Sequence, residues 1–227
     1  MHSKILKELL SAREKKLSVA LVSDLSTGIQ ALVYKDSIFG DLEPEEEILN
    51  HARDNLIHDR STRIDQIFIQ SFNPPKRLII VGAVHIAQPL IEIASTTGFS
   101  ITVVDPRGAF ATSSRFPGID LSEEWPDEAL KKLQIDNRTA IVTLTHDPKL
   151  DDPALEVALD SDAFYIGSLG SKKTHAKRID RLTEAGISTN KIEKIHGPIG
   201  LPIGAKTPAE IAISIMAQIT QTLHRST

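Results

Sequence analysis

The sequence predicts an α/β fold in which a Rossmann-like, doubly wound parallel sheet follows a small N-terminal α+β domain. Three observations support this prediction. From Leu78 onward, apolar runs typical of buried parallel strands alternate with runs of helical periodicity. The first such unit has Gly82 at the end of its first apolar run and Asp105 at the end of its second, as nucleotide-binding βαβ units do. Before Pro74, short β-prone runs lie between two helical stretches instead.

The composition indicates an ordinary globular protein. Its 227 residues are 41% hydrophobic and 25% charged, which predicts a folded chain. A formal net charge of -4 without a basic run gives no reason to expect nucleic acid as a partner. The absence of cysteine excludes disulfides and thiolate ligands. Residues 1–16 lack the apolar core of a signal peptide or a membrane span, so we expect a cytoplasmic protein with no membrane partner.

The N-terminal stretch predicts a helix, a small antiparallel sheet, a second helix and one further strand. Apolar residues recur at helical spacing over residues 3–15. Residues 17–39 contain three short β-prone runs separated by turn residues, which predicts the sheet. Residues 42–58 return to a helical pattern with acids in the first turn, and residues 64–72 predict a single strand.

A rigid break separates the two predicted domains. The run of Asn73, Pro74 and Pro75 is stiff and non-helical. We therefore expect a small N-terminal domain over residues 1–73 and a Rossmann-like domain over residues 74–227.

The second domain alternates strands and helices, which predicts a parallel sheet covered on both faces. Thr207, Pro208 and Glu210 form a capping box with proline at the first helical position, and they predict the start of a last long helix that ends near Leu223. The predicted strands are 77–81, 101–104, 139–145 and 163–166. The predicted helices before the last one are 85–97, 128–133, 153–159 and 171–185.

The turn after the first strand of this domain is similar to a dinucleotide-binding fingerprint. The three glycine positions of that fingerprint hold Gly82, Val84 and Ala87. Alanine is accepted at the third position, but Val84 puts a branched side chain where a pyrophosphate has to approach the backbone. Asp105 is placed to bond a ribose or another diol. The pattern predicts the fold, disfavours NAD(P), and leaves open a βαβ unit that binds nothing at this turn.

The same turn still offers a place for an anion. The amides of Gly82, Ala83 and Val84 precede a helix whose N-terminus carries a positive partial charge. His85, predicted at the start of that helix, either donates to a ligand phosphate or faces solvent.

A second anion site is predicted where a later strand meets a helix. This stretch holds small residues, hydroxyls and a lysine: Gly167, Ser168, Gly170, Ser171 and Lys172. Such groups beside a helix N-terminus suit a phosphate or another oxyanion. The alternative is a flexible loop with a serine cap. Both predicted anion sites lie at carboxyl ends of strands, where open α/β sheets bind ligands.

Three further polar residues are candidates for ligand contact. His146 follows a strand and has carboxylates nearby, so it could bind a ligand or act as acid or base, while the Asp147 after it precedes a proline and is typical of a turn or cap. Arg107 and Arg115 flank the loop after Asp105 and could clamp an anion. The alternative is that these arginines are exposed and bind no anion, as exposed arginines commonly do not.

Five motifs in register resemble the C-terminal Rossmann domain of the XdhC/CoxI family. They read G-A-x-H-I-A, D-P-R-x-x-F-A with R-F-P after it, T-H-D, Y-I-G-S-L-G-S-K-K-T-H, and P-I-G-L-P-I-G-A-K-T-P-A-E-I-A, and they extend from Leu78 to Ile219. The resemblance implies an accessory protein that binds molybdenum cofactor (molybdopterin), protects it during sulfuration and passes it to the apo-enzyme of a molybdenum hydroxylase such as xanthine dehydrogenase. It also implies contact with a sulfurating enzyme, and a homodimer.

The resemblance also suggests where the cofactor lies. The pyranopterin phosphate is expected over residues 82–85 and near residues 167–172, with Asp105 and Arg107 beside it, so that Asp105→Ala weakens binding without unfolding the protein. This is a non-catalytic role. Two alternatives remain: an NAD(P)-linked oxidoreductase with His146 as acid or base, and a degenerate scaffold that binds only a partner protein.

The N-terminal domain diverges from the family pattern. Family members carry a G-S-S-P-R-like and a G-G-C-V-E-like segment there. At the comparable places this chain reads D-L-S-T-G over residues 24–28 and F-G-D-L-E over residues 39–43.

Overall fold

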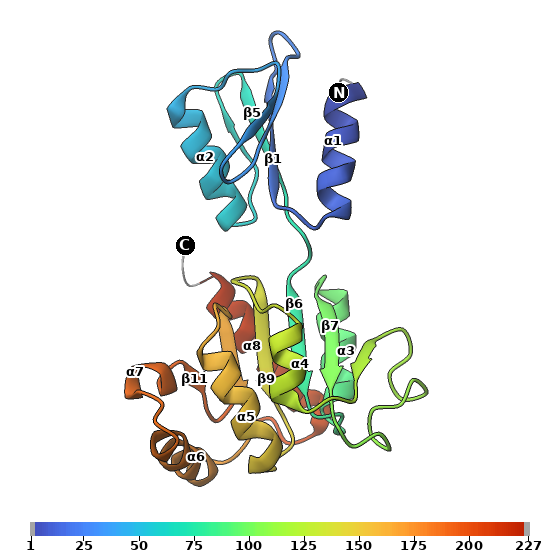
Figure 1. The fold of residues 1–227 in the computed structure, drawn as a ribbon, viewed down its shortest axis with the longest axis vertical. Helices are drawn as coiled ribbons and strands as arrows, with labels where there is room; N and C mark the ends of the chain where they lie inside the picture. The colour runs from blue at the N-terminus through green and yellow to red at the C-terminus, as the bar shows by residue number, and fades with distance from the viewer. Residues whose placement is uncertain (1–2, 225–227) are drawn as a thin grey trace. The chain divides into compact units, whose positions relative to one another are not determined.

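The structure is a computed structural model that describes residues 3–224 of the chain. It divides into two units that join between Pro74 and Pro75 (Figure 1). Each unit has its own sheet and its own hydrophobic core. Within the described residues, no helix combines the length and the apolar character that crossing a membrane requires.

The N-terminal unit is an antiparallel sheet with one helix on each face. Its strands are β1 Val19–Asp24, β2 Gln30–Val33, β3 Ile38–Gly40, β4 Thr62–Ile64 and β5 Ile67–Phe72, and its helices are α1 Ser3–Glu14 and α2 Glu46–Ile57. The strand order is β3-β2-β1-β5-β4, and every neighbouring pair is antiparallel.

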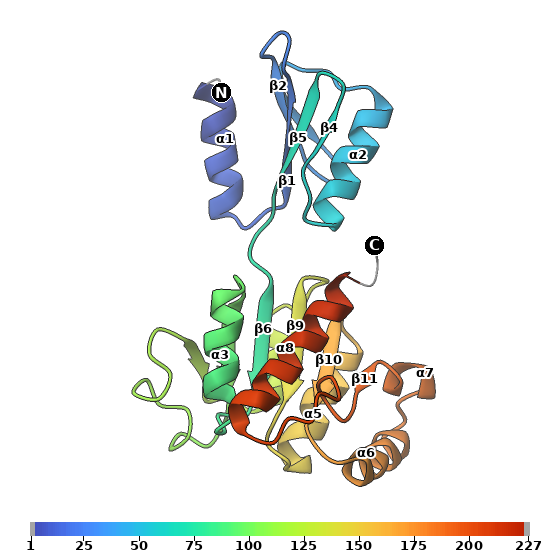
Figure 2. The same ribbon diagram turned by 180° about the vertical axis from the view of Figure 1, so that it is seen from behind.

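The central strand β1 shows why two helices are needed. Successive side chains of a strand point to opposite faces. Val19 and Leu21 pack in one cluster with apolar residues of α1, while Ala20 and Val22 pack in another with Leu49 and other residues of α2. Figures 1 and 2 show the two helices on opposite sides of the sheet. All of β1 except its last residue is therefore buried.

Two elements of this unit differ from the prediction. Helix α2 begins at Glu46, later than expected, so Pro44 lies before the helix and not in its first turn. The single strand predicted over residues 64–72 is a hairpin of β4 and β5. Asp65 turns the chain with a left-handed φ of 48°, a conformation that aspartate tolerates better than most residues.

The second unit is a parallel sheet of the Rossmann type. Its strands are β6 Arg77–Val81, β7 Ser100–Val104, β8 Asp120–Ser122, β9 Thr139–Thr143, β10 Tyr165–Ser168 and β11 Ile195–His196. Its helices are α3 Ala87–Thr96, α4 Pro126–Lys132, α5 Pro148–Leu159, α6 Lys172–Glu184, α7 Thr189–Ile192 and α8 Pro208–His224.

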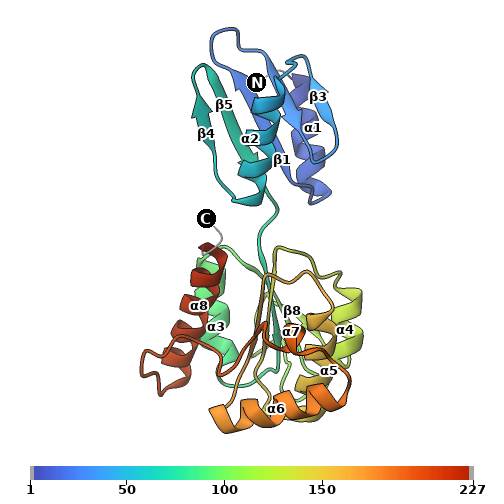
Figure 3. The ribbon, with the colours of Figure 1, turned by 90° about the vertical axis from the view of Figure 1, so that its left-hand side faces the viewer.

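The strand order of this sheet is β11-β10-β9-β6-β7-β8, with all neighbours parallel. It is the doubly wound order of dinucleotide-binding folds, in which the order reverses between the first and fourth strands. Figure 3 shows α3 and α8 on one side of the sheet and α4 and α5 on the other. Two separate apolar clusters fill the two interfaces. The predicted fold class is confirmed.

Some elements of the second unit escaped prediction. The edge strands β8 and β11 and the short helix α7 have no long apolar run, because a sheet edge or a single turn needs none. Helix α5 begins at Pro148 and not at Pro153, which lies inside the helix. Pro148 at its first position and the Asp147 side chain, which accepts from the Lys149 N–H at 3.0 Å, provide the start signal.

Candidate functional site

The carboxyl ends of β6 and β9 meet where the strand order reverses, which is the usual ligand crevice of such sheets. The two ends are closely packed here. A Cβ atom on Gly82 would lie 2.7 Å from Cγ2 of Thr145 and 3.3 Å from its nitrogen. Gly82 also has a φ of 111°, which residues with a side chain rarely adopt. The packing of the two strand ends therefore requires this glycine, whether or not a phosphate approaches it.

Asp105 lies at the end of β7 as predicted, but its carboxylate is fully engaged within the protein. Its side chain is 0% exposed. One oxygen accepts from the Ala83 N–H at 2.8 Å and from Nη2 of Arg107 at 2.7 Å. The other accepts from the Arg107 N–H at 3.0 Å and from its Nε at 2.9 Å. The carboxylate thus ties the turn after β6 to the end of β7.

The protonation state of Asp105 follows from these bonds. Burial by itself would raise the pKa of this carboxyl group. The hydrogen bonds from the Arg107 side chain and from two backbone N–H groups outweigh burial and hold the pKa below its ordinary value. Asp105 is therefore an anion with a structural role, and Asp105→Ala is expected to destabilise the fold, contrary to the prediction made from the sequence.

Arg107 and Arg115 lie beside the same turn and are also engaged. The Arg107 guanidinium lies 4.6 Å from the centroid of the Phe110 ring, in addition to its pairing with Asp105. Arg115 donates through Nη1 to the carbonyl oxygens of Ala83 at 2.9 Å and Phe110 at 2.6 Å. Arg115 therefore fastens the loop after β7 onto the turn after β6, and Arg107 holds the Asp105 carboxylate that bonds the same turn.

Val84 and His85 differ in their surroundings. Val84 is partly buried and packs against the core beneath α3 and α8. His85 is exposed, and it lies in the turn before α3 because that helix begins two residues later than predicted, at Ala87. Of the turn residues predicted to bind a ligand, His85 alone presents an exposed polar side chain.

The second predicted anion loop is shorter than expected. Strand β10 continues to Ser168, so Gly167 and Ser168 are buried in the sheet and not in the loop. The Ser168 hydroxyl bonds that of Thr143 on the neighbouring strand. Gly170, Ser171 and Lys172 remain at the edge of the sheet, with Ser171 as the N-cap of α6, accepting from the Thr174 N–H at 3.1 Å.

His146 is exposed in a tight turn between β9 and α5, with a left-handed φ of 62°. The flanking residues stabilise this turn. Thr145 donates its hydroxyl to Asp151 at 2.6 Å, and the Asp147 N–H donates to the Thr145 hydroxyl at 3.0 Å. Among residues 3–224, no cluster of three or more histidines, cysteines or acids has the arrangement of a metal site.

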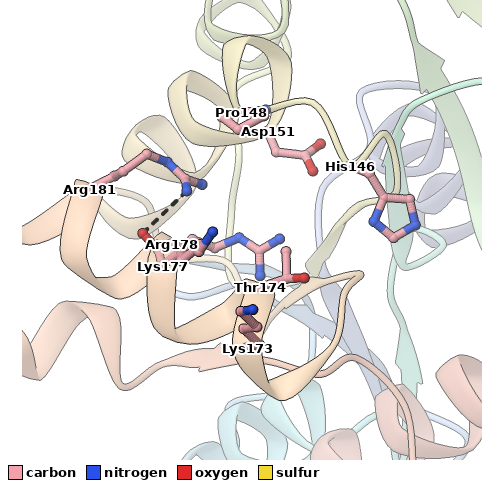
Figure 4. Close-up of a pocket in the computed structure, with 8 residues that line it drawn as sticks. All are labelled: His146, Pro148, Asp151, Lys173, Thr174, Lys177, Arg178 and Arg181. Atoms are coloured by element: carbon pink, nitrogen blue, oxygen red, sulfur yellow. Dashed lines mark hydrogen bonds between the residues drawn. The ribbon is translucent and has the colours of Figure 1, made fainter.

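A pocket of about 280 Å³ opens between the N-terminal part of α5 and one face of α6. Figure 4 shows the side chains around it. They are His146, Pro148 and Asp151 on one side, and Lys173, Thr174, Lys177, Arg178 and Arg181 on the other.

Arg178 is the most unusual member of this pocket. Its side chain is only 2% exposed, although arginine is almost never fully buried unless it is paired. Its Nη2 donates to the Leu169 carbonyl oxygen at 2.8 Å, and its Nη1 lies 3.4 Å from Nδ1 of His175. The buried Nε has no hydrogen-bond partner. Burial lowers the pKa of Arg178 below its ordinary value, against the attraction of Asp151 and Asp152.

The acids near the pocket do not neutralise its cations fully. Asp152 pairs with Arg181 at 2.9 Å between Oδ1 and Nη2, and its other oxygen accepts from Nε. Burial raises the pKa of Asp151, because the Thr145 hydrogen bonds and the charges of Arg178 and His146 only partly oppose it. Two lysines and Arg178 therefore line the pocket with a single carboxyl group, Asp151, that is not paired with Arg181.

The sequence interpretation missed the pocket. His175, which lies among the basic residues of α6, is half-buried, and burial followed by the charge of Arg178 lowers its pKa. The sequence does contain a sign of the basic side of this pocket. Lys173, Lys177 and Arg181 recur every four residues and so share one face of α6. The position of α5 across from that face could not be read from the spacing.

The model of the XdhC Rossmann domain matches residues 78–219 of this chain. Among curated proteins, the chain is 38% identical over 160 residues to a probable xanthine dehydrogenase subunit of Bacillus subtilis, covering 70% of this chain and 46% of that protein. It is 30% identical over 152 residues to the molybdenum cofactor insertion chaperone PaoD of Escherichia coli, covering 67% of this chain and 42% of that protein.

A solved structure described as a xanthine dehydrogenase from Bacillus halodurans matches with a TM-score of 0.77 at 28% identity. The match covers 99% of this chain and 65% of the other. The chain therefore spans less than half the length of the two curated relatives and about two thirds of the solved one.

Proposed function

The chain belongs to the XdhC family, as its sequence motifs predicted, and we propose from this premise that it binds molybdenum cofactor and delivers it for the maturation of a xanthine dehydrogenase-type molybdenum hydroxylase. The names of two relatives support the proposal, since one is a molybdenum cofactor insertion chaperone and the other a probable xanthine dehydrogenase subunit. The client is the apo-enzyme, and a sulfurating enzyme acts on the bound cofactor.

One structural observation favours this role over that of an NAD(P)-linked oxidoreductase. Asp105, at the position where Rossmann proteins bind the ribose, has both oxygens engaged by Arg107 and Ala83. A ribose hydroxyl would have to displace buried charge-assisted bonds, which are the strong ones. The branched side chain of Val84, which packs against the core, further hinders the approach of a pyrophosphate to the backbone. The domain has the Rossmann fold, but the Asp105 carboxylate that would bind the ribose of a dinucleotide is already bonded within the protein.

The proposal assigns the cofactor to the carboxyl edge of the parallel sheet. In this assignment the cofactor contacts the turn of residues 82–85, the turn before α5 and the start of α6, where the side chains of His85, His146, Ser171 and Lys172 are exposed. Arg107 and Arg115 keep the turn in place and offer their partly exposed edges to the ligand. The protein holds and transfers its cargo without a chemical step of its own.

The test compares three ligands on the purified protein. Molybdenum cofactor, NAD and NADP are added in parallel, and the retained ligand is measured after gel filtration. We expect the cofactor to be retained and both nucleotides to be lost. The loaded protein should then activate an apo-form of a xanthine dehydrogenase faster than free cofactor does. Retention of NAD or NADP without cofactor would overturn the proposal, and retention of neither would favour the scaffold alternative.

Two further predictions accompany the proposed role. We expect a homodimer, to be measured by light scattering, and a location in the cytoplasm, to be measured by cell fractionation. Neither is needed for cofactor binding.

A further inference from the structure

The pocket between α5 and α6 collects positive charge on one face of a single helix. Lys173 and Lys177 lie one turn apart, and Arg178 projects its guanidinium into the space between Asp151, Thr174 and His146 (Figure 4). The described residues show no hydrogen bond or ion pair of either lysine side chain to an acid. Three cationic side chains therefore converge on a hollow without a matching number of anions.

The buried Arg178 indicates that the pocket is built for a ligand. Burying a guanidinium with an unsatisfied donor lowers stability unless another group compensates. The contacts of Arg178 are a carbonyl oxygen and a weak approach to a histidine ring nitrogen, and neither carries a charge. An anion in the pocket would place a compensating negative charge beside this guanidinium.

The other groups around the pocket narrow the chemistry of this anion. The Thr174 side chain adds a hydroxyl to the lining, and His146 adds a ring nitrogen at the mouth. Two ammonium groups, a planar guanidinium and a hydroxyl offer more donors than a flat carboxylate can use, and they suit the several oxygens of a phosphate. A metal cation is disfavoured by three like charges. The volume of about 280 Å³ leaves room for a phosphate and for part of the group attached to it.

We propose that this pocket binds the phosphate group of a phosphomonoester through Lys173, Lys177 and Arg178. Asp151 is compatible with this role, because its carboxyl group already accepts hydrogen bonds from the Thr145 hydroxyl and N–H. The pocket is distinct from the turn after β6. This phosphate site deepens the proposed function, because the phosphate of the delivered cofactor is one source of such a group. Only the identity of the ligand rests on the proposed function.

The experiment first uses inorganic phosphate as the probe. Calorimetric titration at constant ionic strength compares the wild-type protein with Lys173→Gln/Lys177→Gln, in which both side chains are exposed and their replacement does not disturb the core. We expect saturable binding by the wild type and an affinity at least about tenfold weaker in the double variant, because two charge-assisted bonds are lost. Lys194→Gln, an exposed lysine outside the pocket, is the matched control and should bind as the wild type does.

Arg178 is tested by Arg178→Lys and Arg178→Met. The lysine variant keeps the charge but loses the planar fork, so its phosphate affinity should fall between those of the wild type and the methionine variant. Because these changes affect a buried residue, the folding of each variant is monitored by circular dichroism. If an Arg178 variant unfolds, the phosphate affinity of Lys173→Gln/Lys177→Gln is the test of the site. The absence of saturable phosphate binding in the wild type, or equal weakening by Lys194→Gln and the double variant, would overturn the inference.

A final arm separates the two sources of phosphate. Inorganic phosphate should compete with molybdenum cofactor if the pocket holds the phosphate of the cofactor, and binding without competition would indicate a separate phosphomonoester. The two proposals can fail separately. Cofactor retention without phosphate binding would overturn the phosphate site and leave the proposed function standing. Phosphate binding without cofactor retention would overturn the proposed function and leave the phosphate site standing.

Discussion

The turn after β6 and the pocket between α5 and α6 are two candidate anion sites at the carboxyl edge of one sheet, but their polar groups are used differently. At the turn, the carboxylate of Asp105 and the guanidinium of Arg107 neutralise each other, and Arg115 is bonded to carbonyl oxygens. In the pocket, Arg178 is buried with an unpartnered Nε, and two lysines lie beside it. The turn carries the familiar sequence pattern, whereas the pocket has the unsatisfied donors.

In this domain a binding motif and a binding capacity are therefore separate properties. A glycine turn followed by an acid predicts a Rossmann unit because both residues solve packing problems at the strand ends. Gly82 avoids Thr145, and Asp105 anchors Ala83. A ligand needs groups that the protein has left unpaired, and this can be judged only from the folded structure.

The largest effect is expected for Asp105→Ala, which should destabilise the Rossmann unit by about 2–3 kcal/mol, because it leaves the buried Ala83 N–H without an acceptor and the partly exposed Arg107 guanidinium without its partner. Urea unfolding is followed by circular dichroism and by the fluorescence of Trp125, the single tryptophan, which lies in this unit. An unchanged unfolding midpoint together with weaker ligand binding would show instead that Asp105 serves the ligand.

A second test uses pH. The folded-state pKa of Asp105 lies below its ordinary value, so its contribution to stability is present above the unfolded value of about 3.9 and is lost as pH falls through the folded value. Asp105→Asn lacks this titration. Its deficit in unfolding free energy relative to wild type should therefore be largest near pH 7 and shrink below about pH 4. Urea midpoints of both proteins at these pH values measure it, and a deficit independent of pH would contradict the ionic role.

The sequence predicted the turn better than the pocket, for a physical reason. The predicted bounds of strand β6 match the structure residue for residue. The βαβ unit was predicted from its alternation of apolar runs and helical periodicity, because such patterns are local properties of the chain. The pocket joins Asp151 on α5 to Lys177 on α6, and that pairing depends on how two helices pack after separate strands. The burial of Ser168 likewise depended on where β10 ends beside β9.

A smaller effect is expected for Val84→Gly, which restores the glycine of the dinucleotide fingerprint. Loss of a partly buried side chain and the added backbone freedom should lower the unfolding free energy by about 1–2 kcal/mol. NAD binding should still be absent, because Ala83 and Asp105 remain bonded to each other. Calorimetric titration with NAD measures this, with Val84→Ala as the control for lost packing. Saturable NAD binding by the glycine variant alone would show that Val84 by itself closes the crevice.

The smallest effect on stability is expected for His85→Ala. The exposed His85 side chain takes part in no hydrogen bond or ion pair among the described residues, so the unfolding free energy should change by less than about 0.5 kcal/mol. If the turn keeps any role in holding the cofactor, this side chain can perform it without breaking an internal bond. Cofactor retention should then fall a few-fold while the urea midpoint stays constant. Equal retention by variant and wild type would show that the His85 side chain does not hold the cofactor.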